Sequence, residues 1–111
     1  MRNYVPKQGD FIVLSFDPQT GHEQKGRRPA LVVSKEAFNH ATGMAFCCPI
    51  TNTIREIPFH IPLPAESSLT GVAMVDQVKS LDYTARHAQF IEKAPKEFLD
   101  EVLSILDSCI Y

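Results

Sequence analysis

The sequence predicts a mainly β fold with a C-terminal helix, built as a small, partly closed β-barrel. Short apolar runs separated by turn residues fill the chain as far as residue 91, a pattern typical of all-β domains. Only the last segment, from residue 95, has the three-to-four spacing of an amphipathic helix. With 111 residues and 44% apolar content, the chain is expected to form one domain, 1–111, around a single modest core.

The predicted strands are short, rich in apolar residues, and bounded by turn residues. The segment 44–50 is apolar throughout, which predicts a central strand. The segment 57–63 alternates, but Pro58 and Pro62 cannot donate to a ladder, so an edge or bent strand is expected there. The remaining predicted strands are 11–16, 30–34, 72–75 and 89–91.

The C-terminal segment is predicted to be a helix that packs on the barrel. Pro95 suits the first helical position, and Glu97 and Asp100 lie in the early turns, where the helix dipole favours negative charge. A shorter helical turn is expected at 35–39. The apolar face of the long helix consists of Phe98, Val102, Ile105, Leu106 and Cys109.

Composition and charge exclude few classes of function. The net charge is −2, yet residues 1–35 hold six Lys/Arg against three Asp/Glu, and residues 36–111 hold five against ten. A basic N-terminal part and an acidic remainder of the chain would allow a polyanion to bind on one side of the protein.

Cysteine usage and hydropathy predict a cytoplasmic protein without membrane contact. Cys47, Cys48 and Cys109 have neither disulfide-framework nor metal-site spacing, so they are expected to be buried free thiols in a reducing compartment. No run reaches membrane-spanning length, and the first residues lack the apolar core of a secretion signal.

A long polar segment, 17–29, connects the first two predicted strands. A hairpin needs only two to five residues, and this connection is about twice as long. Long polar loops on a rigid sheet often carry function, although a merely solvated loop explains the composition equally well. Polar residues also follow two later strands: Thr51 and Asn52 after 44–50, and Asp76, Gln77 and Lys79 after 72–75.

These polar groups suit the cleavage of an RNA phosphodiester without a metal ion. The reaction needs a base, an acid and donors for the charge on the phosphate. Arg28 is predicted to clamp phosphate oxygens, Glu23 to act as the base and Thr51 to donate a hydrogen bond. Gln77 is explained equally well as a group that satisfies backbone at a strand end. The scattered residues His40, His60 and His87 are interpreted as surface or filling residues.

Three sequence blocks resemble the signature of the MazF/PemK/Kid family of toxin endoribonucleases, in order and at the family's spacing. The segments Gly9-Asp10-Phe11-Ile12 and Phe16-Asp17-Pro18 and the residue Arg86 also match. The blocks are Gly21-His22-Glu23-Gln24-x-Gly26-x-Arg28-Pro29, Pro49-Ile50-Thr51 and Asp76-Gln77-Val78-Lys79-Ser80-Leu81-Asp82.

The resemblance implies an SH3-like β-barrel of the CcdB/MazF-like type and a homodimer that serves as the toxin of a type II toxin–antitoxin system. It implies an mRNA interferase that cuts single-stranded RNA at specific sequences, without metal or other cofactor, to 2′,3′-cyclic phosphate and 5′-hydroxyl ends. It also implies a MazE-like antitoxin whose disordered C-terminal tail wraps the dimer and blocks the RNA groove.

The resemblance also assigns site residues by position. Arg28 and Thr51 match the residues used at the scissile phosphate, and Glu23 matches a functionally sensitive acid, which gives the predicted catalytic set. Asp76 matches the acid proposed as base in the Kid branch, but that branch has an arginine where this chain has Met74, so Glu23, Arg28 and Thr51 are preferred. The predicted substrate-binding set is His22, Gln24, Asn52, Asp76, Gln77 and Lys79.

Two other classes stay open at this point. A CcdB-like DNA gyrase poison has the same barrel but acts by binding a protein through its C-terminal end. The ending 106–111 lacks the aromatic-glycine pattern that we associate with that branch, which ranks it second. A catalytically silent SH3-like module that binds RNA or protein is the other alternative.

Overall fold

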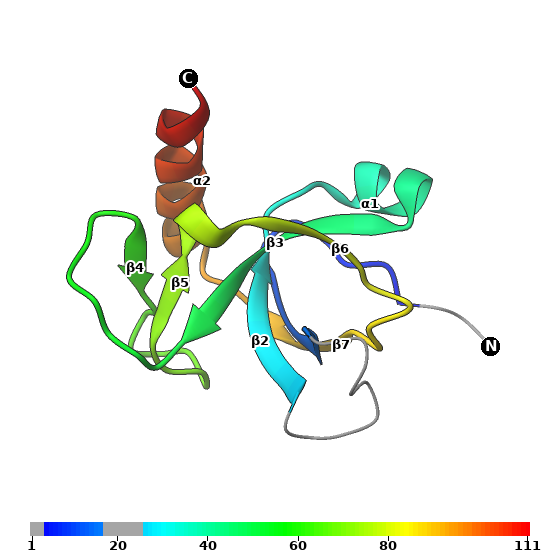
Figure 1. Ribbon diagram of the computed structural model, residues 1–111, viewed down its shortest axis with the longest axis horizontal. Helices are drawn as coiled ribbons and strands as arrows, with labels where there is room; N and C mark the ends of the chain where they lie inside the picture. Colours follow the sequence, from blue (N-terminus) through cyan, green and yellow to red (C-terminus); the bar gives the residue numbers. More distant parts are fainter. Residues whose placement is uncertain (1–3, 17–25) are drawn as a thin grey trace.

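The computed structural model describes residues 4–16 and 26–111, and within these ranges it contains one seven-stranded sheet and two α-helices (Figure 1). The strand order is β4-β5-β3-β2-β1-β7, and β6 pairs with β3 outside that path. All pairings are antiparallel. The elements are β1 (Asp10–Ser15), β2 (Arg27–Val32), α1 (Glu36–Thr42), β3 (Met44–Thr51), β4 (His60–Pro62), β5 (Val72–Met74), the 3-10 helix η3 (Val75–Gln77), β6 (Lys79–Asp82), β7 (Gln89–Lys93) and α2 (Lys96–Ile110).

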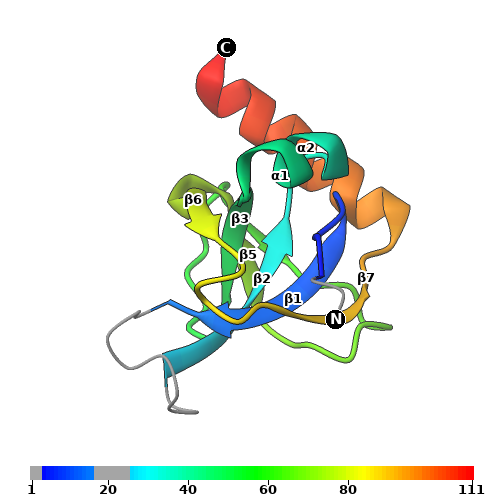
Figure 2. The same cartoon turned by 90° about the vertical axis from the view of Figure 1, so that its right-hand side faces the viewer.

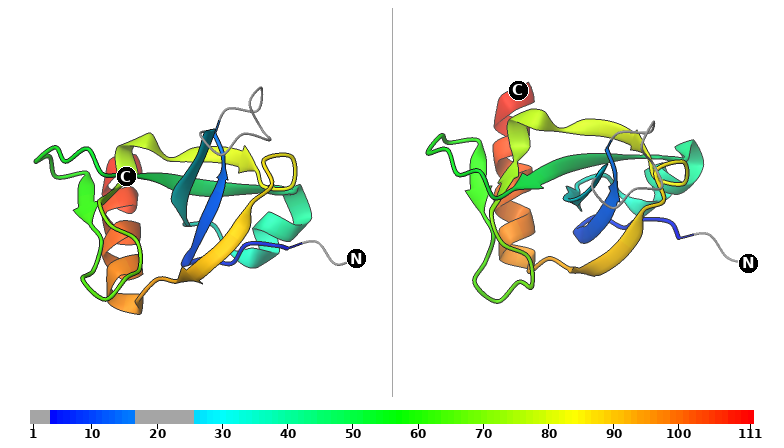
Figure 3. Two further views of the ribbon diagram at one scale, coloured as in Figure 1. Left: turned by 90° about the horizontal axis from the view of Figure 1, so that it is seen from below. Right: turned by 60° about the horizontal axis from the view of Figure 1, so that its bottom comes forward.

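Strand β3 connects the two halves of the curled sheet. Its first half, 44–47, pairs with β6, its middle, 47–49, pairs with β2, and its end, 50–51, pairs with β5. Figure 3 shows β3 crossing the molecule from the β4–β5 pair at one end to α1 at the other. The sheet does not close, because β4 and β7 are its two edges. The predicted mainly β, partly closed barrel with a C-terminal helix is confirmed.

The core lies on both faces of the central strands. Phe11 and Ile12 are adjacent in β1 and fully buried, yet they belong to different apolar clusters, because successive side chains of a strand point to opposite faces. One cluster lies under α2, which contributes Phe98 and Val102 (Figure 2). The other is closed by Leu81 of β6 and by Tyr83. Burial on both sides explains the continuous apolar runs within β1 and β3.

Three predictions about individual elements need correction. Strand β6 was not predicted, because only Leu81 of its four residues is buried and the segment lacks an apolar pattern. Cys109 was predicted to be buried, but it is exposed near the end of α2, whereas Cys47 and Cys48 are buried as predicted. The predicted edge strand is confirmed as β4, but its three residues span much less than 57–63.

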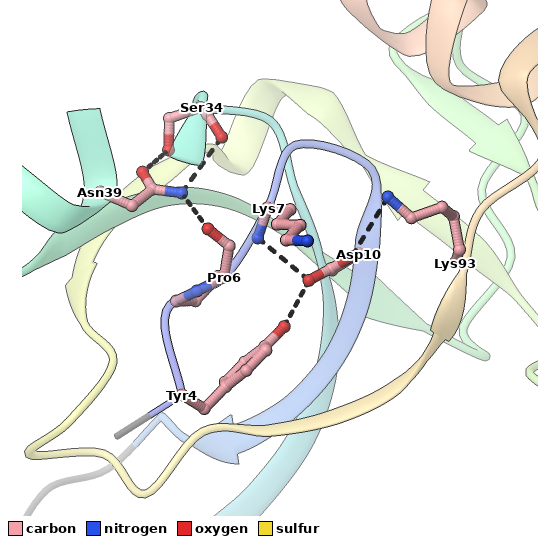
Figure 4. A network of polar contacts seen from close by, with 7 residues as sticks. All are labelled: Tyr4, Pro6, Lys7, Asp10, Ser34, Asn39 and Lys93. Atoms are coloured by element: carbon pink, nitrogen blue, oxygen red, sulfur yellow. Dashed lines mark hydrogen bonds and ion pairs between the residues drawn. The ribbon is translucent and has the colours of Figure 1, made fainter. Parts of the chain in front are cut away.

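A buried polar network fastens the N-terminal segment and α1 to the sheet (Figure 4). The Asn39 amide donates to the carbonyl oxygens of Pro6 at 2.8 Å and Ser34 at 3.2 Å. Asp10 accepts hydrogen bonds from the Tyr4 hydroxyl and from the Lys7 backbone N–H. Burial, and then the hydrogen bond to Asp10, raise the pKa of Tyr4. The network therefore leaves these buried polar groups hydrogen-bonded, as stable interiors require.

Candidate functional site

One face of the sheet brings together side chains from three neighbouring strands. Thr51 pairs with Val72 across β3 and β5, and His60 pairs with Met74 across β4 and β5. Residues that face each other in an antiparallel ladder point to the same side, as do residues two apart in one strand. Thr51, Met74 and His60 therefore share a face, while the residues between them, Ile50, Ala73 and Ile61, enter the core beneath α2.

These side chains line a pocket of about 340 Å³ next to the end of β3. Asp76 and Gln77 enter it from η3, which turns the chain directly after β5. The structure thus brings together three of the predicted site residues, Thr51, Asp76 and Gln77. Among the described residues, the lining consists of Thr51, Thr53, Arg55, Ile57, His60, Met74, Asp76 and Gln77.

A glycine seats Thr51 at the rim of this pocket. Gly71 has φ +109°, and a Cβ added there would lie 2.2 Å from the backbone oxygen of Thr51. A side chain at this position is therefore excluded both by the conformation and by the close approach of β3. The Thr51 hydroxyl accepts a hydrogen bond from the Thr53 backbone N–H at 3.1 Å, which leaves its own proton free to be donated.

Arg28 lies on the same face of the sheet, outside the pocket. The ladder between β2 and β3 ends at the pair Ala30–Pro49, and Arg28 and Thr51 each lie two residues beyond that pair. The Arg28 side chain is exposed, and within the described ranges no residue hydrogen-bonds its guanidinium. The structure thus presents a free cation and a hydroxyl at the same end of one ladder.

The neighbouring Arg27 has a structural role. Its guanidinium donates to the His87 carbonyl oxygen at 2.7 Å, to the Val13 carbonyl oxygen at 3.3 Å and to further acceptors near β7. Arg86 donates to the Phe16 carbonyl oxygen at 2.7 Å. Together these two arginines hold the strand ends between which the segment 17–25 is inserted.

Two predicted residues that the structure describes, Asn52 and Lys79, do not line the pocket. The Asn52 side chain accepts a hydrogen bond from the Thr70 hydroxyl at 2.9 Å and so faces the turn around Gly71. Lys79 belongs to β6, and its ammonium lies 6.0 Å from the centre of the Phe16 ring. His22, Glu23 and Gln24 lie outside the described residues.

His60 is the pocket residue that the sequence analysis misjudged as a surface or filling residue. Its Nε2 lies 3.1 Å from Oδ1 of Asp76, and its side chain is only 6% exposed. The alternating segment 57–63 carried a signal for this position. Because Ile61 must point to the core, His60 points to the opposite, polar face.

The part of the chain that the structure describes contains neither a cluster of potential metal ligands nor a helix that could cross a membrane. Residues 4–16 and 26–111 contain no group of three or more His, Cys, Asp or Glu side chains placed to hold a metal ion. Neither of the helices in these ranges has both the length and the hydropathy needed to span a membrane.

Comparison with known proteins places this chain in a family. A family model described as "PemK-like, MazF-like toxin of type II toxin-antitoxin system" matches residues 7–110. The endoribonuclease toxin MazF of Escherichia coli (strain K12) is 46% identical over 85 residues, which cover 77% of this chain and 76% of that protein. The endoribonuclease toxin ChpB of the same strain is 41% identical over 109 residues, 94% of this chain and 93% of that protein.

Solved structures agree with the sequence comparison. A crystal structure of MazF from Deinococcus radiodurans has a TM-score of 0.86 and 44% identity, and the match covers 97% of this chain and 98% of that one. A MazE-MazF structure from the same organism has a TM-score of 0.87 and 40% identity, over 96% and 97% of the two chains. These relatives are MazF-like rather than CcdB-like, which favours an endoribonuclease over a gyrase poison. The chain belongs to the PemK-like, MazF-like family of toxins of type II toxin–antitoxin systems.

Proposed function

We propose that this chain is the toxin of its toxin–antitoxin pair and that it cleaves single-stranded RNA at specific sequences without a metal ion. Attack of a ribose 2′-hydroxyl on the adjacent phosphorus would release a 5′-hydroxyl and leave a 2′,3′-cyclic phosphate. The observation that carries this proposal is the free guanidinium of Arg28 on the same face and at the same ladder end as the Thr51 hydroxyl.

Arg28 and Thr51 are suited to different parts of the transition state. A guanidinium can donate to two oxygens of the phosphate at once, so Arg28 would neutralise the charge that grows there. Thr51 would add a neutral donor, because its hydroxyl proton is not used within the described structure. Glu23 remains the proposed general base: it would take the proton of the 2′-hydroxyl, and the leaving 5′-oxygen would take up a proton from water. Apart from the proton transfers, in-line attack requires that the 2′-oxygen be aligned with the phosphorus and that the charge on the phosphate be stabilised.

The other predicted residues are proposed to contact RNA on either side of the cleaved bond. Asp76 and Gln77 would do so from within the pocket. Lys79 and Asn52, which lie outside it, would contact the flanking chain, and His22 and Gln24 are proposed to act beside Glu23.

We further propose a homodimer and a MazE-like antitoxin with a disordered C-terminal tail as the protein partners, all acting in the cytoplasm. MazE-MazF structures from Deinococcus radiodurans support an antitoxin of this type. The surface also carries apolar groups suited to protein contact, because the rings of Phe38 and Phe46 are exposed with centroids 4.9 Å apart.

RNA cleavage by the purified chain in excess EDTA tests the proposed reaction. A mixed-sequence RNA is incubated with the protein, and both the cut positions and the end groups are mapped. Discrete cuts with 2′,3′-cyclic phosphate and 5′-hydroxyl ends are expected. Intact RNA after incubation with folded protein, or cutting that requires added Mg²⁺, would contradict the proposal.

A further inference from the structure

The pocket beside Thr51 has the composition of a site for a flat, partly polar ligand. Its volume of about 340 Å³ is at the small end of the range for ligand pockets. Ile57 and Met74 provide apolar walls, and Arg55 and Gln77 provide hydrogen-bonding groups. Because Thr51 is the proposed phosphate contact, the group that occupies this pocket would belong to a nucleotide next to the cleaved bond.

Among the described residues, His60 is the one that holds Asp76 in this pocket. Oδ1 of Asp76 lies 3.1 Å from Nε2 of His60, and within the described ranges no hydrogen bond reaches Oδ2. The Asp76 side chain is 35% exposed, whereas that of His60 is almost completely buried. One carboxylate oxygen is therefore fixed by a rigid ring, and the other is open to a ligand.

The His60 ring has no other polar partner among residues 4–16 and 26–111. Its Nδ1 is buried and has no hydrogen bond to any of these residues, an arrangement that reduces the stability of the folded state. If His60 served only to stabilise the fold, an apolar side chain of similar size would stabilise it more, because it would bury no unpaired nitrogen. Its single polar contact orients Asp76, which points to a role for His60 in ligand binding.

A fixed carboxylate oxygen discriminates between nucleobases by their exocyclic groups. An ionised carboxylate can only accept hydrogen bonds, so it can pair with the amino group of cytosine, adenine or guanine. Uracil presents a carbonyl oxygen where cytosine has its amino group, and two acceptors repel each other. Sites built to receive a particular donor reject an analogue that lacks it.

We propose that this pocket seats one nucleobase of the RNA and that Asp76, positioned by His60, selects a base that carries an exocyclic amino group. The proposal rests on the proposed function for the identity of the ligand. It adds a specificity residue, Asp76, and a positioning residue, His60, to the residues proposed to act at the phosphate.

Binding of two oligonucleotides that differ only in this feature tests the proposal without requiring cleavage. The probes are fluorescent (dC)10 and (dU)10, which lack the attacking 2′-hydroxyl, and binding is measured by anisotropy at neutral pH. Wild-type protein is expected to bind (dC)10 about tenfold or more tightly, the discrimination typical of one good base contact. Asp76→Asn keeps the size of the side chain but adds an amide donor, so the preference is expected to shrink several-fold or reverse.

Two substitutions of His60 separate positioning from folding. His60→Gln retains an N–H donor near the place of Nε2 and should keep most of the preference for (dC)10. His60→Leu retains the volume but removes the donor, so it should lose the preference while the thermal unfolding midpoint stays close to that of wild type. Equal preference in wild type, His60→Gln and His60→Leu would overturn the positioning role.

Mapping of cut sites keeps this inference separate from the proposed function. If wild-type protein cuts RNA, one fixed position beside the cut should be depleted of uracil about tenfold, and Asp76→Asn should restore uracil there. Cutting without that depletion, together with equal binding of the two probes, would overturn the inference and leave the function standing. If the protein cuts no RNA but prefers (dC)10 in a way that depends on Asp76, the inference would stand and the proposed function would be overturned.

Discussion

Asp10 and Asp76 both lie beside strand ends, and they differ in how completely the protein satisfies them. Asp10 is 2% exposed; its Oδ2 accepts from the Tyr4 hydroxyl and the Lys7 N–H, and its Oδ1 lies 3.7 Å from the Lys93 ammonium. Within the described ranges Asp76 has one partner, His60, and more than a third of its side chain is open to solvent.

The difference separates a structural carboxylate from one that is available to a ligand. The two hydrogen bonds and the ion pair of Asp10 tie the N-terminal segment and β7 to β1. In the pocket, by contrast, one oxygen of Asp76 and one nitrogen of His60 have no partner within the described ranges. Buried polar groups are normally satisfied, so a pocket with spare acceptors is where RNA would complete the set.

The adjacent residues Arg27 and Arg28 offer the strongest test of the contrast between structural side chains and side chains available to a ligand. Arg28→Ala is expected to reduce RNA cutting by about 100- to 1000-fold, the usual effect of removing a donor from a developing charge. Its stability should change by less than about 0.5 kcal/mol, because the side chain is exposed and makes no hydrogen bond to a described residue. Initial cutting rates on one RNA and urea unfolding measure both effects. Cutting by Arg28→Ala at the wild-type rate would show that the phosphate clamp is misassigned.

Arg27→Ala is the matched control, with the opposite expected outcome. It leaves acceptors such as the His87 and Val13 carbonyl oxygens without their donor, so the free energy of unfolding should fall by about 1–3 kcal/mol. A variant that loses no stability would contradict the structural role of Arg27.

Substitution of the two aspartates compares the regions directly. Asp10→Ala leaves the part-buried Tyr4 hydroxyl without its acceptor and is expected to destabilise the fold by about 1–3 kcal/mol. Asp76→Asn keeps an oxygen that can accept from the buried His60 ring, so it should change the stability by less than about 0.5 kcal/mol while it alters the base preference in RNA binding. Urea unfolding of both variants measures the difference. Equal losses of stability would remove the distinction between the two carboxylates.

Alkaline pH is expected to destabilise the buried region. Burial raises the pKa of Cys47 and of Cys48 to about 12, from an ordinary value near 9. Below pH 9 both folded and unfolded chains keep these protons. Above it the unfolded chain releases them while the folded chain retains them, so stability should fall as pH rises from about 9 to 12. Urea unfolding at several pH values measures this slope, and the double variant Cys47→Ala, Cys48→Ala should have a shallower one. An unchanged slope would point to other groups, such as Tyr4.

Thiol labelling tests the burial of each of the three cysteines and is expected to have the smallest effect on the protein. Cys109 is exposed, so it should react with a thiol reagent in the native protein, whereas Cys47 and Cys48 should react only after unfolding. Mass spectrometry of the labelled chain distinguishes the three sites. Rapid native labelling of Cys47 would contradict the buried packing of β3.

Local patterns in the sequence determined the class of fold and part of the site. The alternating segment 57–63 identifies an edge strand, and the apolar run 44–50 identifies a central strand. Such patterns can be recognised locally, because successive side chains of a strand point to opposite faces. The spacing of Phe98 and Val102 likewise identifies α2. The block resemblance located Thr51, Asp76 and Gln77, which share one pocket.

Tertiary structure alone decided which polar residues act together. The sequence block singles out Arg28, but it does not give Arg27 its structural role: that role depends on an acceptor 60 residues away, the His87 carbonyl oxygen. His60 meets Asp76, 16 residues later, only through the β4–β5 register and the turn of η3. Strand β6 carries too few apolar residues to be recognised locally, and it forms because β3 offers it a free ladder edge. Pairing across long sequence separations depends on the whole sheet. This is the physical reason that local patterns determined most elements and part of the site, whereas the tertiary structure decided β6 and the contacts of Arg27 and His60.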